Sequence, residues 1–92
     1  MQINTKQNIE YAEMLKALAH PARLCIVKNL IKKGGCTVSY MQTCTGQPQS
    51  TLSQHIAKLR TLKIIKGTRN GKEIKYEVTN DLVKSIINIL YE

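Results

Sequence analysis

The spacing of the apolar residues changes about two thirds of the way along the chain, and this change constrains the fold most. Before Leu62, apolar side chains recur every three or four residues, as in a helix with one buried face. From Ile64 to Val78 the period is two, on either side of Arg69-Asn70-Gly71-Lys72, and Asn-Gly is the strongest short signal for a type I′ hairpin. The sequence therefore predicts several helices and then one hairpin, whose core-facing residues are Ile74, Tyr76 and Val78.

Two helices are predicted at the start of the chain. The first runs from Asn8 to Ala19, with Glu10 and Glu13 early, where the helix dipole favours anions. His20-Pro21 separates it from the second, because proline suits the first position of a helix and restricts the residue before it. We expect the His20 ring to bond a nearby backbone group. The second helix ends at Lys32-Lys33-Gly34-Gly35, which is typical of a helix C-terminus.

A helix-turn-helix is predicted next, over about residues 38–62. Ser39 and Gln42 have the spacing of a capping box, which marks the start of a short third helix. The turn Gly46-Gln47-Pro48 ends this helix, and a fourth helix follows from Gln49 to Leu62. The fourth helix buries one narrow apolar stripe, formed by Leu52, Ile56 and Leu59.

The last predicted helix, over about residues 80–91, has more apolar surface than one supporting face needs. Asn80 is its expected cap. The apolar side chains span roughly 160°, against roughly 100° for a helix with one buried face. They are Leu82, Val83, Ile86, Ile87, Ile89 and Leu90. Because a chain of 92 residues buries little surface by itself, the surplus face predicts association with a second copy.

We expect one domain, residues 1–92, because no linker, repeat or low-complexity stretch divides the chain. Its fold class is mainly α with a small β-hairpin, in the order α-α-α-α-β-β-α. No apolar run approaches the roughly 20 residues that span a bilayer, so no membrane is expected as a partner. The first ten residues lack the features of a secretory signal, which predicts a cytoplasmic location.

The net charge of +8 is concentrated in one segment. Between Lys58 and Lys75 lie seven basic residues and Glu73 alone, which supply six of the eight charges. The helix before this segment has short hydrogen-bonding side chains opposite its apolar stripe, and such side chains suit the major groove. Phosphate contacts position a protein and base contacts specify it. We therefore predict double-stranded DNA as the partner, contacted by Gln49, Ser50, Thr51, Ser53, Gln54, His55, Lys58, Arg69 and Lys72.

Two details of this prediction stay open. The polar face of the fourth helix, taken alone, is equally typical of a solvated surface. His55 lies at the flank of that face, where we expect it to contact a phosphate or to pack beside the hairpin. A single histidine without a second ligand is a poor metal site.

Three segments resemble the ArsR/SmtB family of bacterial winged helix-turn-helix repressors, and the resemblance covers nearly the whole chain. They are A-L-A-H-P-A-R-L from Ala17 to Leu24, Q-P-Q-S-T-L-S-Q-H-I from Gln47 to Ile56, and R-N-G-K-E-I-K-Y-E-V from Arg69 to Val78. The resemblance implies a homodimer through the first and last helices, about residues 8–19 and 80–91. It implies a recognition helix in each major groove of a palindromic operator, and a wing, about residues 64–79, beside the phosphates or minor groove. It also implies repression that a small effector relieves.

The effector sites of that family do not transfer to this chain. The places of the family's Cys-x-Cys-x-x-Cys cluster hold Thr37, Ser39 and Gln42. The zinc-type site needs histidines on the last helix, which offers only Asp81 and Glu92. Members that respond to sulfide or oxidation use a cysteine on the second helix, where Lys28 stands, and another on the last helix, which has none. We predict no metal and no cofactor, and the effector is unknown.

The three cysteines are the remaining candidates for a response. Their odd number and the missing export signal argue against a structural disulfide. We expect Cys25 and Cys44 to be buried and Cys36 to be exposed and reactive. Eight residues of helix would separate Cys36 from Cys44 by about 12 Å, beyond the roughly 7 Å limit for a disulfide, but a loop position lets Cys36 fold back. The hypothesis is a thiol switch in which these two cysteines join and strain the helix-turn-helix.

Other classes of protein fit the sequence less well. A catalytic site is not expected, because there is no glycine-rich phosphate loop, no pair of buried carboxylates and no Cys/His triad. A protein–protein module would need an acidic partner for the basic segment. The alternative that we keep is an effector-independent DNA-binding or architectural protein of the same fold, because the known effector motifs are missing.

Overall fold

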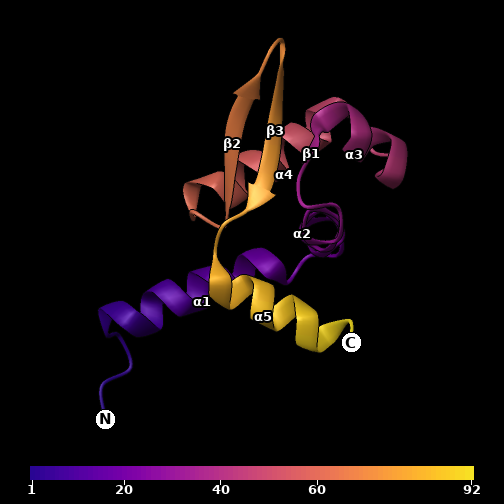
Figure 1. The fold of residues 1–92 in the computed structure, drawn as a ribbon. Coiled ribbons are helices and arrows are strands. Elements are labelled where there is room, and N and C mark those ends of the chain that lie inside the picture. Colours follow the sequence, from indigo (N-terminus) through magenta and orange to yellow (C-terminus); the bar gives the residue numbers. More distant parts are fainter.

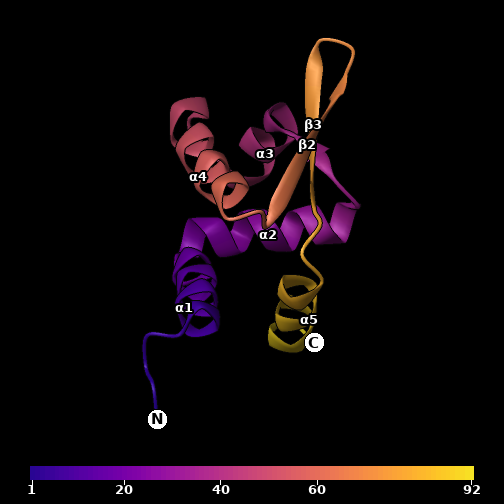
Figure 2. The same cartoon turned by 90° about the vertical axis from the view of Figure 1, so that its left-hand side faces the viewer.

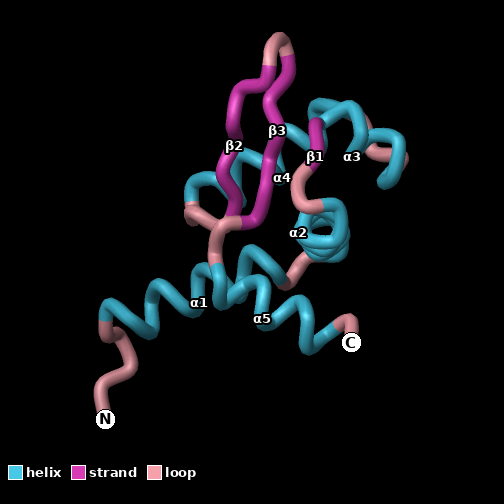
Figure 3. Tube along the Cα trace, viewed as in Figure 1, coloured by secondary structure: helices cyan, strands magenta, loops and turns pink.

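The computed structural model describes all 92 residues as five helices and three strands (Figures 1 and 3). In chain order they are α1 (Lys6–Leu18), α2 (Pro21–Lys33), β1 (Cys36–Thr37), α3 (Val38–Thr45), α4 (Gln49–Thr61), β2 (Ile65–Asn70), β3 (Glu73–Val78) and α5 (Asp81–Leu90). The predicted mainly α fold with a hairpin is confirmed. None of the five helices is both long and apolar enough to cross a bilayer.

Helix α2 lies at the centre of the molecule, in contact with the four other helices and with β3. Figures 1 and 2 show α3, α4 and the hairpin on one side of α2, and α1 and α5 on the other. The tip of the hairpin points away from α1 and α5. The molecule therefore separates a helix-turn-helix with its hairpin from a pair of helices that include both ends of the chain.

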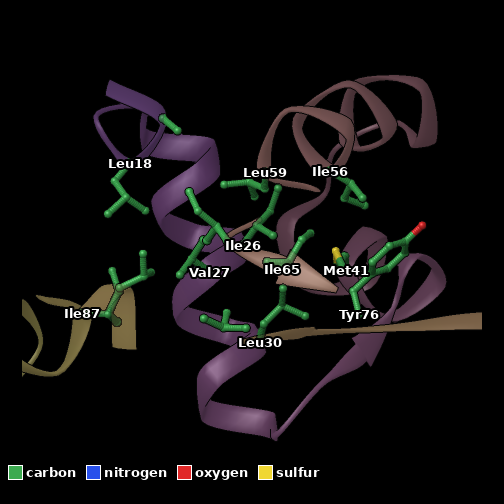
Figure 4. Packing of buried hydrophobic residues seen from close by; sticks show 14 of the residues in the cluster. Leu18, Ile26, Val27, Leu30, Met41, Ile56, Leu59, Ile65, Tyr76 and Ile87 are labelled. Carbon is green, nitrogen blue, oxygen red and sulfur yellow. The ribbon is translucent and has the colours of Figure 1, made fainter. Parts of the chain in front are cut away.

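A hydrophobic core of 17 buried side chains joins these elements, and none of the buried residues is polar or charged. Figure 4 shows Ile26, Val27 and Leu30 of α2 between side chains of α1, α4, α5 and the sheet. The predicted stripe of α4 is confirmed, because Leu52, Ile56 and Leu59 are all buried. Burial of apolar side chains is the main favourable term in folding, so α2 organises the domain.

The sheet has three antiparallel strands in the order β1-β3-β2. The sequence predicted only the hairpin, so the short strand β1 was not predicted. In the structure Cys36 pairs with Tyr76 and Thr37 with Lys75. Strand β1 thus connects the start of α3 to the hairpin. A strand of two residues is too short to show an alternating pattern of apolar and polar residues in the sequence.

The turn of the hairpin differs from the predicted type I′. Asn70 pairs with Glu73, which leaves Gly71 and Lys72 as the two loop residues. Type I′ requires a positive φ at both loop residues, but only Gly71 has one, at 68°. Glycine at the first loop position alone is typical of type II′. The loop thus lies one residue later than the expected Asn70-Gly71, and Arg69 pairs with Ile74 instead of Lys72, a register shift of two residues.

Of the three hairpin residues expected in the core, Tyr76 and Val78 are buried, but Ile74 is 39% exposed. Ile74 pairs with Arg69 close to the tip of the hairpin, and this tip extends beyond the core. The prediction for Ile74 was therefore wrong, because the alternation of a strand continues past the point where the core ends.

The helix ends show which capping predictions were correct. Asn80 caps α5 by accepting from the N–H of Val83 at 3.1 Å, as predicted. Gly34 and Gly46 end α2 and α3 in the left-handed conformation. Helix α1 begins two residues earlier than expected, behind the cap Thr5, so no acidic residue lies in its first turn.

The expected capping box at Ser39 was wrong. The cap of α3 is Thr37, whose hydroxyl oxygen accepts from the N–H of Tyr40 at 3.3 Å. Because pairing of Thr37 with β3 fixes its extended backbone, the helix begins directly after it, and Ser39 already lies inside the first turn.

We predict that Thr37→Ala lowers the free energy of unfolding by about 1 kcal/mol, because the cap of α3 is lost. Ser39→Ala is the matched control, with an expected change below about 0.5 kcal/mol. Urea unfolding followed by circular dichroism measures both. A larger loss for Ser39→Ala than for Thr37→Ala would contradict this assignment of the cap.

Candidate nucleic-acid interface

Helix α4 presents a polar surface opposite its buried stripe. Five of the residues predicted to contact DNA are exposed along it, namely Gln49, Ser50, Ser53, Gln54 and Lys58. Ala57 on the same surface is also exposed and adds a further small side chain to it. Short side chains of this kind allow the backbone of a helix to come close to the floor of a groove.

The hairpin places positive charge beside this helix. All seven basic residues between Lys58 and Lys75 are exposed, and Arg69 and Lys72 lie at or near the tip of the hairpin.

Gly67 allows the side chains of Ile74 and Tyr76 to pack closely against strand β2. A Cβ atom there would lie 2.8 Å from Cε1 of Tyr76 and 2.9 Å from Cγ2 of Ile74. The side chain of Tyr76 occupies the space that a larger residue would need.

A groove of about 310 Å³ lies between the start of α3, helix α4 and the hairpin. Gln49 and Ser53 of α4 and Lys72 of the hairpin line it together. The structure therefore brings predicted residues of the helix and of the hairpin to one surface. Ser39, which the sequence suggested only as a cap, also lines the groove. Ser39 lies in the first turn of α3, which borders the groove. Its place at the start of the third helix is the sequence feature that could have indicated this role.

Thr51 and His55 lie on a different side of α4. Both are half-buried and line a cavity of about 510 Å³ between α4 and the start of α2. The ring of His55 lies 4.8 Å from the ring of His20, centroid to centroid. His55 therefore packs against α2 rather than beside the hairpin, which corrects that expectation.

The predicted role of His20 is confirmed. The N–H of Ala22 donates to Nδ1 of His20 at 3.1 Å, so the imidazole caps α2. Burial lowers the pKa of His55 below its usual value, and the neighbouring His20 and Arg23 lower it further. Like charges and removal from water both disfavour the imidazolium.

The burial of all three cysteines differs from the expectation. Cys36 is buried at 8% exposure in β1, and burial raises the pKa of its thiol, with a smaller contribution from Cys44. Cys44, expected in the core, is exposed in the last turn of α3. Met41 is the residue of α3 that is buried in the core instead. Cys25 is half-buried rather than fully buried, and Nδ2 of Asn29 donates to its sulfur at 3.4 Å.

No three side chains of His, Cys, Asp or Glu come together in an arrangement that holds a metal ion. The two histidines and Cys25 line the same cavity but do not form such a group. Chemically, the exposed surface of α4 and the hairpin offers hydrogen-bond donors and acceptors together with positive charge.

The other side of the molecule exposes apolar side chains of two helices. On α1 these are Ile9, Tyr11 and Leu15, and on α5 they are Leu82, Ile89 and Leu90. Ile89 is 70% exposed. An exposed apolar surface of this extent on a small domain is typical of an interaction site.

The helix-turn-helix region matches a family model described as a helix-turn-helix domain, over residues 18–68. The transcriptional repressor PagR of Bacillus anthracis is 41% identical over 96 residues, which cover 98% of this chain and 96% of PagR. The transcriptional repressor SmtB of Mycobacterium tuberculosis is 32% identical over 82% of this chain and 55% of SmtB. The chain belongs to the ArsR/SmtB family of winged helix-turn-helix transcriptional repressors.

Solved structures of repressors share the fold of this ArsR/SmtB chain. The crystal structure of PagR matches with a TM-score of 0.83 and 43% identity, over 89% of this chain and 93% of PagR. The repressor BigR from Xylella fastidiosa matches with a TM-score of 0.85 and 37% identity, over 94% of this chain and 87% of BigR. The predicted family and the winged helix-turn-helix fold are both confirmed, and β2 and β3 form the wing.

Proposed function

We propose that this protein is a sequence-specific DNA-binding repressor that acts as a homodimer on a palindromic operator. One observation carries the proposal: the polar surface of α4 and the basic wing meet at one groove, on the side of α2 opposite α1 and α5. PagR and BigR are both named as repressors, which supports repression as the outcome of binding.

In this proposal α4 reads base edges and the wing holds the phosphates. Gln54 has the side chain that pairs bidentately with adenine, and Ser50 and Ser53 suit either donors or acceptors. Lys58, Arg69 and Lys72 are exposed cations at the ends of this surface, suited to phosphates or the minor groove. Because Thr51 and His55 are half-buried against α2, they act through the position of α4 more than through DNA contacts.

The dimer would form through α1 and α5. The exposed apolar residues of these helices support this arrangement, because a second copy covers them without changing the opposite side of the molecule. Two copies would then place two α4 helices in successive major grooves, so a two-fold dimer implies a palindromic site. The helix-turn-helix near residues 38–62 and the wing near 64–79 bind DNA, whereas residues 8–19 and 80–91 dimerise.

The effector in this proposal is an oxidant or reactive sulfur species that acts on Cys36 and Cys44. The exposed Cys44 would react first: its thiolate attacks hydrogen peroxide, releases hydroxide and becomes a sulfenic acid. The thiol of Cys36 then displaces water from that sulfur, and the two cysteines together have lost two electrons in forming a disulfide. Because Cys36 pairs with Tyr76, this disulfide would pull β1 from the wing.

We predict that Gln54→Ala lowers the preference for the correct base by about 1–3 kcal/mol, because a bidentate base contact is lost. Arg69→Ala should instead weaken binding to all duplexes about equally and flatten its salt dependence. Titrations of operator and random duplexes at several salt concentrations measure both. Equal effects of both changes on specific and random DNA would contradict the assignment.

We predict that the wild-type protein sediments as a dimer, at twice the 10.4 kDa of one chain, and that Ile89→Glu converts it to a folded monomer. The reason is that the glutamate is solvated in a monomer and would be buried in a dimer. Lys84→Glu is the matched control and should stay dimeric, because Lys84 is exposed on the same helix but lies about 140° around the helix axis from Ile89. A dimeric Ile89→Glu protein would place the interface elsewhere.

We predict that mild oxidation by peroxide or polysulfide releases operator DNA from the wild-type protein and joins Cys36 to Cys44, as detected by mass spectrometry. Cys44→Ser should block both effects, whereas Cys25→Ser should leave them intact. The pair takes no part in sensing if Cys36→Ser and Cys44→Ser proteins release DNA under oxidant just as the wild type does.

A further inference from the structure

The chain has two histidines in all, and the fold brings them into contact. His20 is the cap of α2, and His55 lies in the middle of α4. Their ring centroids lie 4.8 Å apart, with the planes tilted by 52°. The contact therefore joins the central helix α2 to the proposed recognition helix α4.

The hydrogen bond of His20 fixes which tautomer its neutral ring adopts. Nδ1 accepts the N–H of Ala22, so the proton of the neutral ring is on Nε2. Protonation would place a hydrogen on Nδ1 and remove this acceptor. A positive charge at the start of α2 would also oppose the helix dipole. The cap of α2 therefore depends on an unprotonated Nδ1.

The surroundings of the two rings contain no negative charge that would compensate for protonation. Helix α2 contributes Arg23, which raises the local positive potential, and the thiol of Cys25. The end of α3 and the following turn contribute the uncharged Thr45 and Gln47. Helix α4 itself contributes the uncharged Thr51, and no carboxylate lines the cavity.

The position of His55 connects this contact to the surface that faces away from α2. Gln54 precedes it directly and is exposed, while Ile56 follows it and is buried in the core. His55 and Gln54 are neighbours in the same continuous helix. A shift of α4 at His55 therefore also moves Gln54 relative to the wing. Small displacements of a reading helix are sufficient to misalign bidentate contacts with bases.

We propose that His20 and His55 are positioning residues for the recognition helix, and that protonation of His55 separates the two rings and reduces discrimination between operator and random DNA. The second half of this inference rests on the proposed DNA-binding function. Binding to random duplex should not weaken with acid, because added positive charge favours phosphate contacts. Acidification should therefore lower specificity rather than affinity in general.

The sign of the pH effect follows from the lowered pKa of His55. A histidine whose pKa is lower in the folded than in the unfolded protein leaves the folded state fully stable above its unfolded pKa of about 6.5. As the pH falls below that value, the unfolded state binds more protons and stability declines. The effect should disappear when His55 is replaced by a residue that does not titrate.

The first experiment needs no DNA. Because the chain has two histidines, proton NMR gives two imidazole titrations. In the wild type we expect His55 to titrate below about 6.5, and in His20→Asn we expect its pKa to rise towards that value. Asparagine caps a helix as well but does not titrate, so the start of α2 is preserved. An identical His55 midpoint in both proteins would overturn the proposed coupling.

The second experiment measures the ratio of operator to random-duplex affinity at about pH 7.5 and about pH 5.5. For the wild type we expect this ratio to fall by roughly fivefold or more at the lower pH. In His55→Gln and in His20→Asn the ratio should change much less with pH, whatever its starting value. A wild-type ratio that does not depend on pH, despite coupled NMR titrations, would overturn the positioning role.

The two experiments separate failure of this inference from failure of the proposed function. A wild-type protein without preference for any duplex at either pH would contradict sequence-specific binding. The NMR titrations would still decide whether His20 lowers the pKa of His55.

Discussion

The packing of α2 against the rest of the chain is the interaction on which this structure depends. Ile26, Val27 and Leu30 are almost completely buried, and α2 contacts α1, α3, α4, α5 and β3. A domain of 92 residues buries a smaller share of its surface than a larger one, so a single central helix has to serve both sides. One side of α2 supports α3, α4 and the wing, and the other supports the pair α1 and α5.

This division explains how so short a chain separates two tasks. Seven exposed cations lie between Lys58 and Lys75, and one of them, Lys72, lines the groove that α4 shares with the wing. The exposed apolar residues of α1 and α5 lie on the other side of α2, where they do not compete with a charged partner. A second copy on α1 and α5 would fix the distance between two recognition surfaces, so dimerisation and DNA recognition depend on the same helix α2.

Local patterns predicted the helices, the position of the hairpin and the buried stripe of α4, because these features repeat within a few residues. Long-range contacts decided the features that the sequence did not predict. Pairing of β1 with β3 makes Thr37, rather than Ser39, the cap of α3 and also buries Cys36. The contact between His20 and His55 joins residues from two helices, and no spacing rule connects them. The polar face of α4 was predicted as a whole, but the structure turns Thr51 and His55 towards α2.

The central claim is that the surface of α4 and the wing reads a base sequence and does not only bind phosphates. The most direct test selects duplexes from a random pool with the wild-type protein and then compares the Kd of the selected sequence with that of a shuffled duplex of equal length and salt. The account predicts a palindromic sequence that binds about a thousandfold more tightly, as is typical of specific DNA-binding proteins. Enrichment of no sequence, with equal Kd values for both duplexes, would contradict it and would favour an architectural protein that binds phosphates alone.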